Sequence, residues 1–359
     1  MMNRRQFLSV VVPAAAVAGC SRAEPVSRDR PQDSAALVTG SPASPSAERI
    51  KLSVSKNTGV LCYVDWIVAR EKGFFSAQRL DVEFFDDDVT RPHGHAWTSG
   101  WLNGPAGPVR NDVVVTEYPA LQDIASGVMD YYVVAGEHSG CRQLVVPVNS
   151  AIRTVTELKG KRIGTRPQEE TLIWDSLIGP SRPGTEPTRW LRPPFPPDPT
   201  KELEWVEQEF AAGRIDAYVG ADPIPEILKA DGVARLVASN TWTPPLNGWY
   251  CCMLAVRKEM VDTYPDLPRR FTRAIRGAAA FVEEKPAEAV DLAVAVSHLP
   301  RDTRQDLSAR LLGEYVWTAT GRIEEDLERY FQLLIDADRI PATTPPRELV
   351  KRVYRGAEA

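Results

Sequence analysis

The chain has 359 residues and a formal net charge of −5 at pH 7, and 43% of its residues are hydrophobic. This composition is typical of a globular protein, and the length allows two domains of ordinary size. The net negative charge argues against nucleic acid as a partner, because phosphate binding requires a basic face. A small anion is not excluded, since it needs only a local site.

The first twenty residues have the features of an export signal. Arg4 and Arg5 precede an apolar run over residues 7–19, which is shorter than the roughly 20 residues that a membrane-spanning helix needs. The run ends in the letters VAGC, which resemble a lipobox. We therefore expect a twin-arginine signal peptide over residues 1–19 and a lipid on Cys20, which would place the protein outside the cytoplasm, anchored to the cell membrane or periplasmic. An ordinary signal peptide with a chance cysteine is the alternative.

Residues 20–47 are rich in Ser, Pro and Ala and hold almost no large apolar side chains. Such a segment cannot bury enough surface to fold, so we expect a flexible tether. The folded body then begins near Glu48.

Short apolar runs alternate with segments of helical periodicity in the body. The helical segments are residues 63–75, which should end at Gly73, then 267–284 and 322–337. Alternation of this kind predicts an α/β architecture, and runs that are apolar on both faces suit buried parallel strands. The predicted strands are 51–55, 80–84, 112–116, 131–136, 142–148, 161–165, 216–220 and 253–257.

Residues 179–200 break this alternation because they hold eight prolines. Proline denies a strand or a helix its backbone N–H group, so we expect a surface insertion here.

Four segments, taken in their order along the chain, resemble one protein family. They are residues 64–85, 150–165 with the core "ELKGKRIG", 210–228 with "GRIDA", and 257–293 with "TYPD" and "KPAEAV". The family is the NMT1-like group of ABC-importer solute-binding proteins, which serve nitrate, sulfonates, taurine and thiamine precursors.

The resemblance implies a type II periplasmic-binding-protein fold, with two α/β lobes of mostly parallel sheets joined by two crossing segments. Lobe 1 would comprise residues 48–145 and 246–359, and lobe 2 residues 146–245. A small solute would bind in the cleft as the lobes close on a hinge, and the partners would be a membrane permease and an ATPase. No bond is broken in such a mechanism. The chain also has no Walker loop, GxSxG or HExxH motif, so we expect no catalytic residues and no cofactor.

Polar residues that follow the predicted strands are candidates for the cleft, where helix N-termini favour an anion or a polar solute. The candidate ligand-binding residues are Asn57, Thr58, Gly59, Thr116, Glu117, His138, Ser139, Gly140, Thr165, Arg166, Asp222, Trp249 and Tyr250.

Most of these residues have an ordinary structural alternative. Asn57, Thr58 and Asp222 suit helix capping, and Glu117 suits a solvated capping carboxylate. Arg166 could pair with a nearby glutamate on the surface, and Trp249 could pack at the hinge. Glu117 favours a cationic or neutral solute, whereas the planar fork of Arg166 favours an anion, so the solute's charge stays open.

The loop at 136–146 and the Tyr-Cys-Cys at 250–252 both flank the predicted crossing, so their side chains could be neighbours. The first interpretation is a disulfide from Cys141 to Cys251 or Cys252, which export permits. This pairing leaves one thiol over, which could pair with Cys62. The second is a soft metal bound by His138, Cys141 and a later cysteine. The third is a set of buried core thiols.

A possible second metal site and two rival functions also stay open. His93 and His95 could suggest a metal site, but two histidines in a glycine-rich loop usually face water. An enzyme similar to thiamine-pyrimidine synthase, which uses clustered cysteines with iron on this fold, is the rival function, although an export leader argues against it. A lobe that senses or binds a partner protein is the third class.

Overall fold

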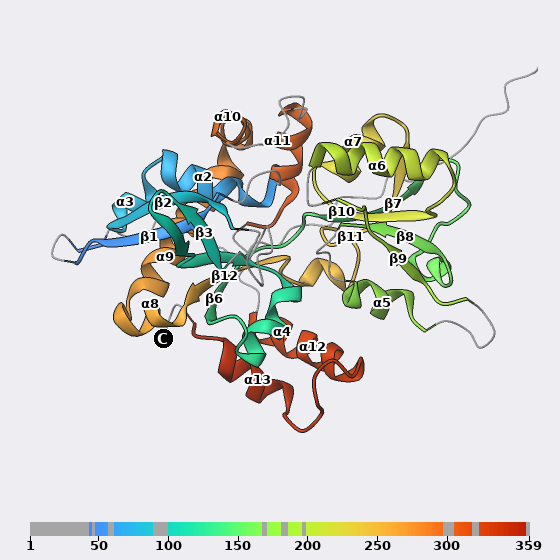
Figure 1. Ribbon diagram of the computed structural model, residues 1–359. Helices are drawn as coiled ribbons and strands as arrows, with labels where there is room; N and C mark the ends of the chain where they lie inside the picture. The colour runs from blue at the N-terminus through green and yellow to red at the C-terminus, as the bar shows by residue number, and fades with distance from the viewer. Residues whose placement is uncertain are drawn as a thin grey trace, which may run out of the picture.

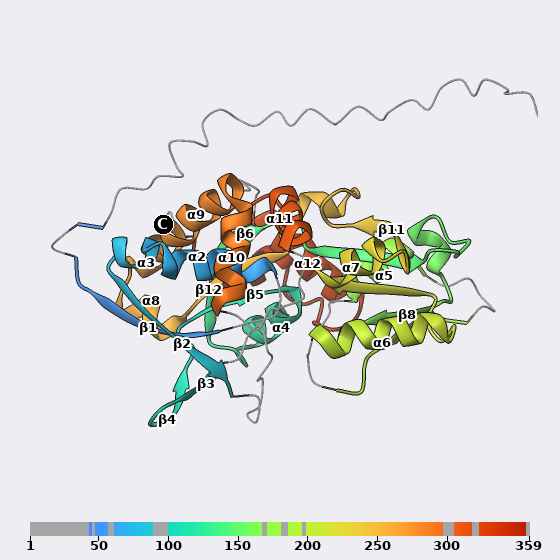
Figure 2. The same cartoon turned by 90° about the horizontal axis from the view of Figure 1, so that it is seen from above.

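The computed structural model describes residues 43–44, 47–56, 61–88, 100–166, 171–180, 186–195, 199–296, 305–317 and 323–356. Its strands form two sheets that lie side by side (Figure 1). Figure 1 shows helices α11 and α12 on opposite sides of the region between the sheets, and Figure 2, seen from above, places both at the middle of the molecule. No helix in these ranges is long and apolar enough to cross a membrane.

The first sheet has the strand order β4-β3-β2-β1-β5-β12-β6. Six of its strands come from the first part of the chain, and β12 returns from much later. The bounds are β1 Ile50–Ser55, β2 Leu80–Asp87, β3 Trp101–Gly104, β4 Gly107–Arg110, β5 Val113–Thr116, β6 Tyr131–His138 and β12 Cys252–Arg257.

The second sheet has the order β11-β7-β10-β8-β9. Its strands are β7 Arg142–Pro147, β8 Arg162–Thr165, β9 Arg189–Leu191, β10 Ala217–Ala221 and β11 Ala234–Ser239. The chain therefore enters the second sheet at Arg142, a few residues before the boundary that the sequence suggested. We expected residues 179–200 to form a surface insertion outside the sheets. Strand β9 lies within this segment and pairs in parallel with β8 at the sheet edge, so part of the segment belongs to the sheet. An edge strand tolerates prolines beside it, since one side needs no partner.

The α/β fold class is confirmed, and both sheets are mixed rather than parallel throughout. Strands β1 and β2 are parallel, as are β8 and β10. The expectation of parallel pairing was wrong for β7, which runs antiparallel to β10 and β11, and for β12, which runs antiparallel to β5 and β6. Strands β5, β6 and β10 end at the junction between the sheets, whereas β7 and β12 begin there, so these neighbours must point in opposite directions.

Helices cover both sheets, and the predicted helix ends are close to those observed. Gly73 has a φ of 78° directly after α2 and its C-cap, as a left-handed glycine cap requires. The helices are α2 Val64–Glu71, α3 Phe74–Ala77, α4 Tyr118–Ser126, α5 Leu172–Ile178, α6 Pro199–Ala211, α7 Ile224–Ala230, α8 Lys258–Thr263, α9 Leu267–Glu284, α10 Pro286–Val296, α11 Gln305–Glu314, α12 Ile323–Asp336 and α13 Pro346–Val353, with short 3₁₀ turns η2 Leu61–Tyr63, η3 Val155–Leu158 and η4 Leu246–Gly248.

One apolar core continues across the junction between the sheets. It joins Val114 and Met253 of the first sheet to Leu144 and Val219 of the second, and it includes buried side chains of α12 and α13. A second core lies under α2 and α9 on the first sheet. Helices α12 and α13 thus bury one side of the junction, and α11 packs on the core that contains Cys141 and Cys251.

Tyr250, at the start of the return crossing, is held from two sides. Its ring lies so close to Gly136 of β6 that a Cβ at this glycine would come within 2.2 Å of the tyrosine Cε1. Its backbone N–H donates to the Asp326 Oδ2 of α12 at 3.0 Å. The position of the crossing therefore depends on Gly136, which has no side chain to displace the tyrosine ring, and on the Asp326 carboxylate, which accepts from the tyrosine N–H.

The Gly136→Ala variant should be destabilised by about 1–3 kcal/mol, because the added methyl group must displace the Tyr250 ring in a packed core. Thermal unfolding measures this. The control is Gly313→Ala, since Gly313 lies in α11 with open space around its Cα and alanine there should gain up to about 1 kcal/mol of helix propensity. Equal melting temperatures for the two variants would contradict the contact.

Burial raises the pKa of Asp326 to about 6, although the Tyr250 N–H acts to lower it. Between pH 4 and pH 6 the folded protein thus binds more protons at this group than the unfolded chain, so the contribution of Asp326 to stability falls as pH rises through this window. Asp326→Asn keeps an oxygen acceptor for Tyr250 and removes the titration. The variant should gain about 1–3 kcal/mol relative to the unaltered protein between pH 4 and pH 7, measured by urea unfolding. A difference that is constant with pH would refute this.

Candidate functional site

A pocket lies at the junction and takes its walls from both sheets. Its water-accessible volume is about 50 Å³, enough for a few water molecules. The loop after β5, the start of β7, helix α5 and the return crossing all contribute. The lining residues are Glu117, Tyr118, Pro119, Arg142, Ile173, Trp174, Asn240, Leu246, Trp249, Tyr250 and Cys251. The structure thus brings Glu117, Trp249 and Tyr250 together at one site.

The two charged residues of the pocket neutralise each other. Arg142 Nη2 donates to Glu117 Oε1 at 2.7 Å, and both side chains are buried. Burial raises the pKa of Glu117, while the Arg142 guanidinium opposes this rise. Glu117 occupies the N-cap position of α4 but makes no capping hydrogen bond with its side chain. The carboxylate therefore serves the ion pair across the junction, and the pocket offers no net charge.

Aromatic rings form much of the pocket wall. Tyr118 and Trp249 meet edge to face, with ring centroids 5.7 Å apart, and Tyr118 also packs on Tyr330 at 4.7 Å. Within the described residues the buried Tyr118 hydroxyl has no hydrogen-bond partner. A buried hydroxyl without a partner costs free energy, so a polar group of a bound solute would gain by bonding to it.

The turn between β6 and β7 is strained and held in place. Cys141 has a φ of 142°, in a region that residues other than glycine rarely adopt, and Gly140 has a φ of 89°. Asn240 Oδ1 accepts hydrogen bonds from the backbone N–H groups of Cys141, at 3.0 Å, and Arg142, at 2.8 Å. Ser139 Oγ donates to the Trp249 carbonyl at 2.9 Å. Ser139 and Gly140 thus shape the crossing and do not line the pocket.

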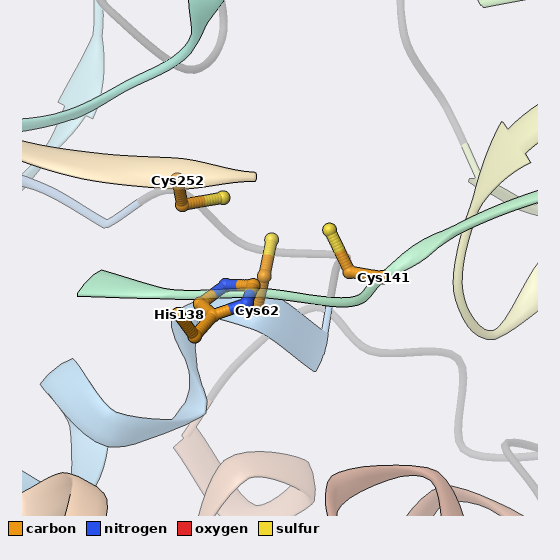
Figure 3. A group of neighbouring side chains, drawn as sticks. All are labelled: Cys62, His138, Cys141 and Cys252. Atoms are coloured by element: carbon orange, nitrogen blue, oxygen red, sulfur yellow. The ribbon is translucent and has the colours of Figure 1, made fainter. Parts of the chain in front are cut away.

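Three cysteines and one histidine converge beside this turn. One ligand atom from each of Cys62, His138, Cys141 and Cys252 lies within 4.8 Å of the others, and all four side chains are buried. Figure 3 shows the three sulfur atoms pointing into the same space, with the His138 ring next to Cys62. Cys251 belongs to the pocket wall instead. The four described cysteines are free thiols, so the expected disulfide does not occur among them in this structure.

Electrostatics couples these groups to nearby acids. Hydrogen bonding from Cys141 holds the pKa of Cys62 well below its usual value. Burial by itself would lower the pKa of His138. Interactions with Cys62, Cys251 and Asp65 together raise this pKa by more than burial lowers it, so the net shift is upward. Burial raises the pKa of Asp65 to about 7 and that of Glu137 well above its usual value, and Glu137 accepts from the Trp66 indole N–H.

Several predicted residues lie elsewhere. Arg166 is buried in the second sheet, with its Nε 3.8 Å from Glu202 Oε2, and it does not line the pocket. Thr116 and Thr165 are buried at strand ends outside the pocket. Asp222 accepts hydrogen bonds from Tyr315, at 3.0 Å, and Gln143, at 2.7 Å, and burial raises its pKa to about 7. These two bonds tie the loop after β10 to the loop after α11 and to β7.

Some predictions fall on residues outside the described ranges. These are Cys20, Asn57, Thr58, Gly59, His93 and His95.

Sequence reasoning missed seven residues of the pocket wall: Tyr118, Pro119, Arg142, Ile173, Trp174, Asn240 and Leu246. Tyr118 and Arg142 directly follow residues that were chosen, Glu117 and Cys141, and a positive charge beside a cysteine at a crossing was an available signal. Asn240 and Trp174 carry no local signal, because only the folded chain brings them to the pocket.

Comparison with known proteins agrees with this architecture. Residues 204–297 match the NMT1-like family, and a search of curated proteins found no match. The alkanesulfonate-binding protein SsuA from Xanthomonas axonopodis pv. citri, solved with bound MOPS, has a TM-score of 0.59 and 19% identity over 86% of this chain and 99% of its own.

Two further solved structures resemble the chain. The periplasmic nitrate-binding protein NrtA from Synechocystis PCC 6803 has a TM-score of 0.62 and 13% identity, covering 85% of this chain and 86% of its own. The desulfurization enzyme DSZB has a TM-score of 0.57 and 14% identity, covering 86% of this chain and 97% of its own. The chain therefore has the α/β fold of the periplasmic binding proteins.

Proposed function

We propose that the protein is the extracytoplasmic solute-binding component of an ABC importer. The observation that supports this best is the pocket at the junction, because Glu117 and Tyr118 directly follow strand β5 of the first sheet while Arg142 begins strand β7 of the second. A molecule bound there touches both halves, and it can favour a closed arrangement only through such contacts. The proteins of similar fold that are named as sulfonate-binding and nitrate-binding support this function.

The sequence suggested one lobe of residues 48–145 with 246–359 and a second lobe of residues 146–245. We assign the two halves of the structure to these lobes and move the first boundary to Arg142. The two separate sheets support the assignment. The pocket as it stands has room for a few water molecules, so a larger solute requires the walls to part. Opening at the two crossings, with the lobes moving as rigid bodies, provides this.

The walls favour a neutral or zwitterionic solute with a flat or apolar part. Arg142 is committed to Glu117, so the pocket offers little to a bare anion such as nitrate. Trp249 and Trp174 offer aromatic surface. Among the solutes that the resemblance suggests, a thiamine pyrimidine precursor or taurine fits this wall better than nitrate.

An enzyme of the same fold, similar to thiamine-pyrimidine synthase, is the second candidate. One specific observation favours it: the Cys251 thiol lines the pocket, and hydrogen bonding from Cys141 holds its pKa well below the usual value. The discriminating measurement is recovery of the solute after long incubation with the protein. Unchanged solute supports binding alone, and a new product supports the enzyme.

Binding should depend on the Tyr118 hydroxyl. Tyr118→Phe removes a buried oxygen that has no partner among the described residues, so the melting temperature without solute should stay the same or rise. Affinity for the solute should fall about fivefold, the value of one hydrogen bond near 1 kcal/mol. A thermal-shift screen over nitrate, sulfonates, taurine and pyrimidine precursors finds the solute, and quenching of tryptophan fluorescence measures its affinity.

The matched control is Tyr132→Phe on β6, whose ring contacts Lys258 and Arg355 away from the pocket. Its affinity should equal that of the unaltered protein. Absence of any thermal shift across the screen would count against solute binding. Equal affinity in both variants would move the site away from Tyr118.

Location should depend on Cys20. If the leader is cleaved before this residue and a lipid is attached, Cys20→Ala removes the attachment point, and the protein should leave the membrane fraction. Fractionation of cells expressing the full chain measures this. Unaltered protein found in the cytosol with residues 1–19 intact would contradict the proposed location.

A further inference from the structure

We propose that Cys62, His138, Cys141 and Cys252 bind one thiophilic transition-metal ion, of the Zn²⁺ type, in a closed four-ligand site. Three thiolates and one imidazole form a ligand set that zinc uses in structural sites. The proposal does not depend on the identity of the solute, and it goes beyond solute binding.

The separations of the ligand atoms are close to what such an ion requires. With metal–sulfur distances of about 2.3 Å and metal–nitrogen distances of about 2.0–2.1 Å, ligand atoms at the corners of a tetrahedron lie about 3.5–3.8 Å apart. The four ligand atoms here all lie within 4.8 Å of one another. An ion would therefore need to draw the most distant atoms together by about 1 Å, which changes of side-chain rotamer can supply.

His138 provides an independent indication. Its side chain is fully buried, and neither ring nitrogen has a hydrogen-bond partner of acceptable geometry among the described residues. Tyr315 stacks on the ring at 5.4 Å and Trp317 packs against it at 4.8 Å, so its orientation is fixed. A metal ion would satisfy one nitrogen of a ring that the protein otherwise buries at a cost.

The surroundings also suit a site with three thiolates. Arg142 Nη1 donates to Cys141 Sγ at 3.0 Å, so the guanidinium that pairs with Glu117 also places positive charge beside the thiolates. Cys141 adopts its strained backbone conformation next to this contact, and the strain aims the thiol at the other ligands.

The place of the ligands in the fold indicates a structural role. His138 ends β6, Cys141 leads into β7, Cys252 begins β12, and Cys62 lies in η2 after β1. One ion would thus link both crossings to the first loop of the first sheet. Four protein ligands leave no open position for a substrate, as in structural rather than catalytic zinc sites.

Adjacent cysteines provide the test. Cys252 is a ligand in the proposal, and Cys251 is not. Full-length protein, purified under reducing conditions without chelator, is analysed by elemental mass spectrometry. The unaltered protein and Cys251→Ser should carry about one ion per chain, and Cys252→Ser and His138→Gln less than about a tenth of that.

Cobalt(II) keeps the test decisive if the ligand variants do not fold. Unaltered protein and Cys251→Ser, stripped and reloaded with Co²⁺, should both show the sulfur-to-metal charge-transfer and intense visible bands of a tetrahedral thiolate site, and Zn²⁺ should abolish them. The proposal fails if no ion is found and no such bands develop. It also fails if Cys251→Ser loses the metal as Cys252→Ser does, or if fresh protein has a disulfide among Cys62, Cys141 and Cys252.

Discussion

The pairing of β12 with β6 at the junction is the constraint on which the other features depend. Cys252 lies opposite His138 in the register, and the Cys251 N–H donates to the His138 carbonyl at 2.9 Å. The outgoing crossing starts from β6 and the return crossing ends in β12, so this pairing fixes both passages between the sheets at one point. The proposed movement of two lobes needs such a point, because bodies that move rigidly about a hinge must keep a fixed axis. The pocket and the cysteine–histidine cluster lie on either side of it.

Electrostatics at the junction follows from burial. Glu117 and Arg142 come from different sheets and lose most of their water, so either charge alone would be costly there. Together they are neutral, and the same guanidinium also donates to the Cys141 thiol. Since Arg142 begins β7, the ion pair is one of the polar links between the sheets. A solute that enters the pocket meets this link as a polar surface without net charge.

The sequence predicted local structure well and long-range geometry poorly. Alternating runs located eight strands and the ends of α2, α9 and α12, because these depend on neighbours along the chain. The direction of β7 and β12 could not follow from apolar runs, since buried strands of either direction need the same side chains. Arg166 illustrates the limit at the site: its position after β8 suggested the cleft, but the structure places it beside Glu202 of α6, 36 residues later in the chain. The sequence suggested that His138, Cys141 and one of Cys251 and Cys252 could be neighbours, whereas the place of Cys62 beside them and the choice of Cys252 required the fold.

Arg142 connects the pocket to the cluster, and this has a physical consequence for the proposed metal site. Thiols that bind a metal lose their protons, so the contact from Arg142 to Cys141 would change from a weak bond to a neutral thiol into a charge-assisted one. The guanidinium would then share its charge between Cys141 and Glu117, and the acceptor strength of Glu117 toward a solute would rise. The backbone provides a second connection between the ion and the pocket. Because Cys251 is adjacent to Cys252 in the chain, binding of Cys252 to an ion would also fix Cys251 in the pocket wall. Metal occupancy would therefore set the shape and polarity of the pocket as well as the stability of the junction, although the ion itself would never touch the solute.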